Sequence, residues 1–379
     1  MDDYTRHLKL WHALHVMNSG WIARKFNMTH EDLHVDGPVL IVPNHVSAWD
    51  PLLVALSLRD KQAYFVASEH LFRMGPVSQL LEFVVAPIPR RKASTGTDTV
   101  KACLRHLREG HSICLFAEGE QSWNGRNIPI FPANGKLVKS SGATLVTYRL
   151  EGAYLSLPRW GKGVRRGKVH GHPVGIYPPE QLKNMTPKEI NALIERDTAE
   201  DAWERQRLSP VRYKGKRRAE GLERALYLCP RCRRIGSLHT KGNRIFCDCG
   251  LDLEYTETGF FQPEQPFPNL AEWDDWQREK LHAREFNRPA EEGLLFSDGG
   301  VTLTKIGAGH REEHLGAGAL QMYEDRLVCA DHSFPLSEIS YMADVLASRL
   351  LLTVSGEYYE ILSSNGVSFR KYLEIWRKH

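Results

Sequence analysis

Between residues 39 and 150 the sequence alternates short apolar runs with segments of helical periodicity, and this limits the fold more than any other feature. Apolar runs bounded by Pro, Gly and polar residues indicate buried strands, and they fall at 39–42, 63–67, 83–88, 112–117 and 144–150. Helical patterns separate them at 51–59, 72–82, 97–109 and 134–141. Such alternation predicts an α/β domain, with a mainly parallel sheet flanked by helices.

A histidine and an aspartate five positions apart follow the first apolar run, within Asn44-His45-Val46-Ser47-Ala48-Trp49-Asp50. Because α/β proteins bind ligands at the carboxyl ends of strands, His45 is predicted to lie at a sheet edge. Asp50 can fix the imidazole tautomer there, so that the free ring nitrogen takes a proton from an attacking hydroxyl. A plainer interpretation stays open: Asp50 followed by Pro51 is also a favourable helix start, and His45 an ordinary loop residue.

Two further motifs end apolar runs of the same region. In Leu115-Phe116-Ala117-Glu118-Gly119-Glu120-Gln121-Ser122, Glu118 can accept hydrogen bonds from hydroxyls and Gly119 allows close backbone approach. The basic cluster Ile88-Pro89-Arg90-Arg91-Lys92 can grip a phosphate. A strand-to-loop turn and a solvated charge run are the alternative interpretations.

In this order, the motifs resemble the lysophospholipid acyltransferase family, which includes the 1-acylglycerol-3-phosphate acyltransferases. The resemblance covers roughly residues 20–210. Its first block, His-x4-Asp, is matched by His45 and Asp50, with Asn44 also typical. The later blocks are matched by Arg90, by Phe116, Glu118, Gly119 and Ser122, and loosely by Ala143-Thr144-Leu145-Val146-Thr147-Tyr148.

The resemblance implies an O-acyltransferase with His45 as general base and Asp50 as its orienting partner. It implies a substrate-binding set made of Asn44, Arg90, Glu118, Gly119, Gln121 and Ser122. The hydroxyl of a lysophospholipid or related glycerolipid would attack an acyl thioester, either acyl-CoA or acyl carrier protein. Gln121 stands where the family has an Arg associated with acceptor phosphate binding, so weaker phosphate recognition is expected. The alternative is a catalytically silent lipid- or protein-binding scaffold on the same fold.

The charge and hydropathy patterns favour a membrane surface over nucleic acid as partner. The net charge of +4 over 379 residues is mild, although basic residues cluster at 159–168 and 214–218. Such clusters suit anionic headgroups or simple solubility. No run reaches the ~20 apolar residues that span a bilayer, and no signal peptide is apparent. Residues 8–26 have amphipathic spacing, which predicts either an interfacial helix or a helix packed on the core. We expect a cytoplasmic protein, peripheral on the cytoplasmic face of a membrane.

Four of the seven cysteines are grouped in two pairs, Cys229 with Cys232 and Cys247 with Cys249. A Gly-Asn turn at 242–243 lies between the pairs, so the pattern predicts a hairpin and a zinc ribbon holding structural Zn²⁺. His239 is a reserve ligand. Two disulfides are the alternative, which the lack of a secretory signal disfavours. The other cysteines are expected to be buried thiols.

The C-terminal part predicts a small β-rich domain that ends in a helix. Strands are expected at 301–303, 319–322, 326–329, 350–354 and 358–361. The final helix carries apolar residues at i, i+3, i+4 and i+7. This pattern resembles a pleckstrin-homology or GRAM-type barrel and suggests a protein partner.

The predicted domains follow from these assignments. Earlier helices are expected from Thr186, as a capping box, to about Gln206, and from about Asn269 to Phe286. The division is an acyltransferase domain at 1–210, a basic linker at 211–225, the zinc ribbon at 226–258, a linker and helix at 259–290, and the barrel-like domain at 291–379.

Overall fold

The computed structural model describes residues 3–68, 76–90, 97–307 and 311–379. The chain forms two compact units. The first consists of Met1–Arg159 and Val164–Lys214, and the second of Trp160–Gly163 and Gly215–His379. The finer division into five parts stays a prediction.

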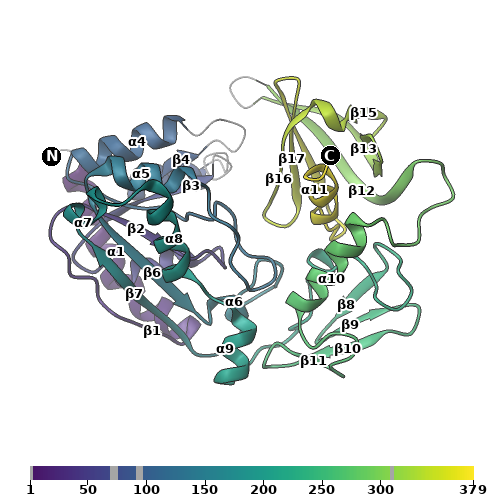
Figure 1. The fold of residues 1–379 in the computed structure, drawn as a ribbon, viewed down its shortest axis with the longest axis horizontal. Helices are drawn as coiled ribbons and strands as arrows, with labels where there is room; N and C mark the ends of the chain where they lie inside the picture. The colour runs from purple at the N-terminus through teal and green to yellow at the C-terminus, as the bar shows by residue number, and fades with distance from the viewer. Residues whose placement is uncertain (1–2, 69–75, 91–96, 308–310) are drawn as a thin grey trace. The chain divides into compact units, whose positions relative to one another are not determined.

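A seven-stranded sheet organises the first unit (Figure 1), in the order β1-β7-β6-β2-β5-β3-β4. Its strands are β1 Met28–His30, β2 Val39–Pro43, β3 Ala63–Ser68, β4 Ile88–Arg90, β5 Ser112–Cys114, β6 Thr144–Glu151 and β7 Val169–Tyr177. Each neighbouring pair is parallel except β6 with β7. The predicted α/β class with a mainly parallel sheet is therefore confirmed.

Helices cover both faces of this sheet. They are α1 Asp3–Phe26, α2 Asp50–Ala55, α3 Pro76–Val85, α4 Thr97–Arg108, α5 Ala133–Ser141, α6 Ala153–Ser156, α7 Pro179–Lys183, α8 Pro187–Thr198 and α9 Ala202–Leu208. Leu40 and Val42 alternate along β2 and share one buried cluster with apolar residues of α4, α5 and α8. Helix α1 lies behind the sheet in Figure 1. Burial on both faces explains why β2 reads as a continuous apolar run.

Two predictions of secondary structure in this unit were wrong. The apolar run Phe83-Val84-Val85-Ala86 was predicted as a strand, but α3 extends to Val85 and β4 begins only at Ile88. A short apolar run suits either a buried strand or a buried helix end, so periodicity could not decide. The helix predicted from Thr186 to Gln206 is divided after Thr198, because Asp201 caps a new helix by accepting hydrogen bonds from Trp203 N and Glu204 N.

Helix α1 was predicted to be either a helix packed on the core or an interfacial helix, and it has features of both. Trp11, Ile22 and Phe26 are buried against the unit. Met17 and Trp21 are exposed by 73% and 54%, so an apolar stripe faces solvent. Within the described residues, no helix has the length and hydropathy that crossing a bilayer requires.

The second unit contains two antiparallel sheets. The four-stranded sheet runs in the order β11-β10-β9-β8, with β8 Leu238–Lys241, β9 Arg244–Cys247, β10 Asp252–Tyr255 and β11 Phe261–Gln262. The seven-stranded sheet has the order β15-β14-β13-β12-β18-β17-β16. Its strands are β12 Leu294–Ile306, β13 Glu312–Tyr323, β14 Arg326–Cys329, β15 His332–Pro335, β16 Ile339–Val345, β17 Arg349–Val354 and β18 Glu357–Ser363. The helical elements are η2 Leu222–Arg224, α10 Leu270–His282, η4 Leu336–Glu338 and α11 Arg370–Trp376.

The C-terminal sheet is larger than the sequence predicted. The five expected strands and the final helix are present, but β12 and β13 have 13 and 12 residues, and β15 and β16 were missed. In β12 the register with β13 shifts between Asp298 and Val301, across Gly299 and Gly300. This bulge lets β12 pair with β13 along its length and with β18 after the bend. Assignment to the pleckstrin-homology or GRAM class stays a prediction.

One buried cluster joins α10, α11 and the C-terminal sheet of the second unit. Tyr227 and Leu228, next to the first cysteine pair, share a buried cluster with Leu281 of α10 and with the C-terminal sheet. Arg370 of α11 donates to both carboxylate oxygens of Asp274 of α10, at 2.7 and 2.9 Å, and both side chains are buried. The buried charge of Asp274 is therefore compensated by a residue 96 positions later in the sequence.

Candidate active site and cysteine cluster

The predicted catalytic residues lie where the parallel strands end. His45 follows β2, Glu118 follows β5, and Arg90 is the last residue of β4. Because β2, β5, β3 and β4 are parallel neighbours, their carboxyl ends share one edge of the sheet. The topology thus collects three motifs that lie far apart in the sequence.

His45 and Asp50 form a direct pair. His45 Nδ1 lies 2.8 Å from Asp50 Oδ2. The Asp50 carboxylate is fully buried and also accepts hydrogen bonds from Val46 N and Ser47 N, at 2.6 and 2.8 Å. Trp49, not Asp50, is the N-cap of α2, which removes the capping interpretation. With Nδ1 engaged by a carboxylate, Nε2 is the ring nitrogen left for proton transfer.

The environment of His45 supports this geometry. The Phe116 ring stacks on the imidazole with 4.1 Å between centroids, and the His45 side chain keeps 16% of its surface exposed. A ring held on one side by an aromatic and at one nitrogen by a carboxylate has few orientations. The arrangement can therefore present Nε2 to a hydroxyl without reorganisation.

Glu118 is directed toward the protein backbone. Its carboxylate accepts hydrogen bonds from His45 N at 2.9 Å, Ile128 N at 2.8 Å and Asn127 Nδ2 at 3.0 Å. Burial raises the pKa of Glu118, and the three hydrogen bonds lower it. The effect of burial is the larger, so the pKa is about 7. These contacts support a role in fixing the His45 loop; contact with substrate stays a prediction.

Asn44 and Ser122 are likewise engaged by the backbone. Asn44 exchanges two hydrogen bonds with the Leu150 backbone, at 3.1 and 2.7 Å, and so ties the His45 loop to β6. Ser122 N donates to His45 O at 2.9 Å, and its hydroxyl donates to Arg126 O at 2.6 Å. Both residues are buried, and their hydrogen bonds support the positions of the loops that carry the predicted catalytic residues.

Gly119 and Arg90 lie side by side. Gly119 has φ +74°, and a Cβ there would lie 2.7 Å from Arg90 Nη1 and 2.3 Å from the Phe131 ring. The Arg90 guanidinium stands over that ring, 4.9 Å from its centroid. Only glycine leaves room for this cation, because a side chain would be strained and would clash. Arg91 and Lys92, the rest of the predicted basic cluster, lie outside the described residues.

A second arginine, which the sequence did not single out for the site, lies beside Gln121. Arg159 Nη1 donates to the Gln121 carbonyl at 3.3 Å and to Glu120 Oε2 at 3.5 Å, and its guanidinium stacks on Trp123. Asn127 and Phe131 were missed as well. Asn127 contacts Glu118 and Phe131 contacts Arg90 only once the loop after β5 has folded. No local sequence pattern indicates these contacts.

The four predicted cysteines converge in the second unit. Their sulfurs all lie within 4.8 Å of one another, and the four thiols are free. Cys229 and Cys249 are 3.6 Å apart, and Cys232 and Cys247 are 3.7 Å apart, too long for a disulfide. Four ligands at the ~2.3 Å Zn–S distance of a tetrahedral site would be separated by about 3.8 Å, so the donors fit this ion. His239 is exposed and outside the cluster.

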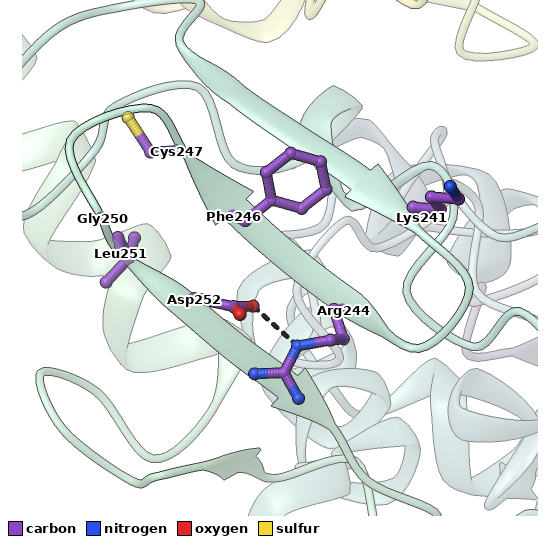
Figure 2. A pocket seen from close by; sticks show the side chains of 7 residues that line it. All are labelled: Lys241, Arg244, Phe246, Cys247, Gly250, Leu251 and Asp252. Carbon is purple, nitrogen blue, oxygen red and sulfur yellow. Dashed lines mark hydrogen bonds and ion pairs between the residues drawn. The ribbon is translucent and has the colours of Figure 1, made fainter.

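The hairpin that carries the second cysteine pair was also predicted correctly: β8 and β9 flank residues 242–243. Burial disfavours ionisation of Cys232, but hydrogen bonds from Arg234 and other neighbours outweigh it and lower its pKa. Figure 2 shows a pocket on this sheet beside Cys247, lined by Phe246 and by the Arg244–Asp252 ion pair. Arg244 Nε donates to Asp252 Oδ1 at 2.7 Å.

The first unit therefore has an α/β sheet whose carboxyl edge holds a histidine oriented by an aspartate, a geometry that can take a proton from a hydroxyl. Residues 25–151 match the model of the Acyltransferase family. The match includes His45, Asp50, Arg90 and Glu118.

Curated relatives align with the same part of the chain. A chloroplastic 1-acyl-sn-glycerol-3-phosphate acyltransferase of Brassica napus is 27% identical over 131 residues, which are 34% of this chain and 37% of the relative. One from Arabidopsis thaliana is 26% identical over 130 residues, 34% of this chain and 36% of the relative. The chain thus spans little more than a third of their length. The 1-acyl-sn-glycerophosphate acyltransferase of Thermotoga maritima superposes with a TM-score of 0.42 at 18% identity, covering 50% of this chain and 76% of that one.

The raised pKa of Glu118 predicts a pH-dependent stability. The folded state binds this proton more tightly than the unfolded chain, whose ordinary carboxyl pKa is 4.5. The contribution is complete below about pH 4.5 and is lost as the pH rises through about 7, by up to about 3 kcal/mol. We expect Glu118→Gln to flatten the pH dependence of the unfolding free energy between pH 5 and 8, measured by denaturant titration. Glu195→Gln, an exposed control, should keep the wild-type slope; equal slopes for wild type and Glu118→Gln would contradict the expectation.

Proposed function

We propose that the chain moves a fatty acyl group from an acyl thioester to the hydroxyl of a lysophospholipid or related glycerolipid. The observation that carries this proposal is the His45–Asp50 pair, at 2.8 Å with a buried carboxylate, inside a segment that matches the Acyltransferase family. The two plant relatives are named for the acylation of 1-acyl-sn-glycerol-3-phosphate, which supports a glycerolipid acceptor.

His45 acts as the general base in the proposed reaction. Its Nε2 takes the proton of the acceptor hydroxyl while the oxygen attacks the thioester carbonyl. The carbon–sulfur bond then breaks, and the protonated imidazole returns the proton to the leaving thiolate. No acyl-enzyme forms, because the substrate supplies the nucleophile. Asp50 keeps Nδ1 protonated throughout and stabilises the imidazolium. The donor is acyl-CoA or acyl carrier protein.

A membrane surface is the proposed site of this reaction. The stripe of α1 that includes Leu14, Met17 and Trp21 is exposed, at spacings of three and four residues. Lys25 lies on the Trp21 and Trp49 rings, at 4.7 and 4.1 Å from their centroids. An apolar stripe with a cation beside it suits a peripheral position on an anionic leaflet. We place the protein on the cytoplasmic face. The ribbon and the C-terminal sheet are proposed to dock a protein partner.

The cysteine cluster is proposed to hold one structural Zn²⁺. All four ligands are protein thiols, so a bound ion would have no open position for substrate. Its role would be to stabilise a segment of short strands with little apolar area of its own. This assignment rests on the sulfur separations of 3.6 and 3.7 Å.

Incubation of the purified protein with labelled acyl-CoA and a panel of lysophospholipids and monoacylglycerol tests the activity. Release of free CoA thiol together with a labelled diacyl product is expected. The competing function is a silent scaffold, favoured by the missing cation at Gln121. It would be supported if neither acyl-CoA nor acyl carrier protein supplied an acyl group to any acceptor.

Arg90 is expected to select phosphate-bearing acceptors. Charge-assisted hydrogen bonds contribute about 1.5–3 kcal/mol, so Arg90→Ala should raise KM for a phosphate-bearing acceptor by about 10- to 100-fold. KM for a neutral acceptor should change little, because no anion is lost there. Steady-state kinetics with both acceptors measure this difference. Arg59→Ala, an exposed arginine on another loop, should change neither value. Equal effects on both acceptors would remove Arg90 from phosphate binding.

A further inference from the structure

A second cluster of metal-ligating side chains lies in the first unit, at the end of α4. His106, Glu109 and His111 place one ligand atom each within 4.8 Å of one another. The cluster precedes β5, whereas His45 follows β2. Because β2 and β5 are parallel, the two sites lie at opposite edges of the sheet. The cluster therefore serves no step of the proposed acyl transfer.

The backbone brings the two histidines together. Gly110 has φ +86°, and Gly110 N donates to Leu107 O while His111 N donates to His106 O. This is the Schellman pattern of a helix end, in which the residues holding the outer hydrogen bond are normally apolar and in contact. Here both positions are imidazoles. The turn therefore holds the two imidazoles close together.

The ligand separations fit a metal site, although the two imidazoles are also within hydrogen-bond distance of one another. His106 Nδ1 and His111 Nδ1 are 3.3 Å apart, and Glu109 Oε2 lies 3.6 Å from His111 Nδ1. Nitrogen ligands at the usual Zn–N distance of 2.0–2.1 Å in a tetrahedral site are separated by about 3.3 Å. An N–H hydrogen bond is typically shorter, near 2.9–3.0 Å.

The surroundings keep the ligands ordered and accessible. The Tyr4 ring stacks on His111 with 4.2 Å between centroids, and Tyr64 packs against His106 at 4.6 Å. The Glu109 side chain is 50% exposed, so an ion and its water can enter from solvent.

We propose that His106, Glu109 and His111 bind a divalent transition-metal ion, with zinc the best match, in a three-ligand site completed by water. Imidazole nitrogen and carboxylate oxygen are suitable ligands for Zn²⁺, whereas an all-oxygen site would favour Mg²⁺ or Ca²⁺. A bound ion would join the α4–β5 turn to Tyr4 of α1 through the stacked His111 ring.

Zinc stoichiometry by equilibrium dialysis of the full chain tests the proposal. Zn²⁺ is the probe, and the cysteine cluster is used as an internal reference. Two equivalents per chain are expected for wild type and one for His106→Gln/His111→Gln. The matched control His34→Gln, an exposed histidine of the same unit, should keep two. A Cys229→Ser variant should lose the thiolate site and keep the histidine site, which distinguishes the two ions.

Glu109→Gln provides a variant that should fold normally, since the side chain is exposed. It should weaken the second zinc equivalent by at least about tenfold, because a ligand charge is lost. Isotope-labelled histidine resonances report the same event, with His106 and His111 shifting on Zn²⁺ addition and His34 unchanged. Retention of the second equivalent in the double variant would overturn the proposal. So would wild-type protein in which Zn²⁺ leaves the His106 and His111 resonances unmoved.

Discussion

His45→Ala is expected to lower kcat by about 10²- to 10⁴-fold, because that is the usual cost of losing a general base. KM for the acceptor should change far less, since the proposed role of the ring is to take a proton and not to hold the lipid. Steady-state assays of thiol release measure both constants. Asp50→Asn should also lower kcat strongly, because it removes the carboxylate that accepts from Nδ1 and fixes the tautomer.

The chain offers a matched control for this experiment. His30 and Asp32 form another half-exposed His–carboxylate pair in the same unit, 3.4 Å apart, away from the carboxyl ends of β2 and β5. His30→Ala should leave turnover unchanged. Near-normal kcat in a folded His45→Ala protein would exclude His45 as the base and leave the scaffold interpretation.

Removal of the proposed zinc is expected to unfold much of the second unit. Structural zinc in small metal-dependent folds contributes apparent free energies of about 10–16 kcal/mol, more than most domains have in reserve. Tyr227 and Leu228 adjoin Cys229 and belong to the core shared with α10 and the C-terminal sheet. Loss of the metal should therefore affect more than the strands next to the cysteines.

Hydrogen exchange on protein treated with a chelator measures this effect. Amides of β8, β9 and α10 should lose protection, while β2 and β6 of the first unit keep theirs. Cys229→Ser should show the same pattern without chelator, and Cys329→Ala, a buried thiol outside the cluster, should not. Purified protein with under about half an equivalent of zinc and full protection of β8 and β9 would contradict the assignment.

Motifs whose residues lie close together in the sequence were the easiest features of this molecule to predict. A single turn brings His45 and Asp50 together, and another, in which Arg233 N donates to Cys229 O, carries the Cys229–Cys232 pair, so local geometry nearly determines both. The α/β class with a mainly parallel sheet followed from the alternation of apolar runs and helices, whereas the order of strands in the sheet was not predicted. The pairing of Glu118 with His45 N could not be predicted, because it depends on β2 and β5 becoming neighbours across 73 residues.

Where the sequence pattern is compatible with more than one secondary structure, tertiary packing determined which one formed. The Phe83–Ala86 run became the end of α3, and the helix after Thr186 was interrupted because the Asp201 carboxylate offers a better cap than continuation. Substrate roles were given to Asn44, Glu118 and Ser122 because the family resemblance implies them. Their contacts with Leu150, Ile128 and Arg126 depend on loops whose paths no local pattern specifies.

The buried Arg370–Asp274 pair affects the order in which parts of the second unit can fold. A lone buried carboxylate is costly, so α10 gains little by docking before α11 arrives. Arg370 also donates to Ala225 O, 145 residues earlier, and β12 pairs with β18 across about 60 residues. Contacts of such sequence separation form slowly. Docking of α10 is therefore expected to await synthesis of Arg370, so that a nascent chain ending before this residue would keep α10 undocked.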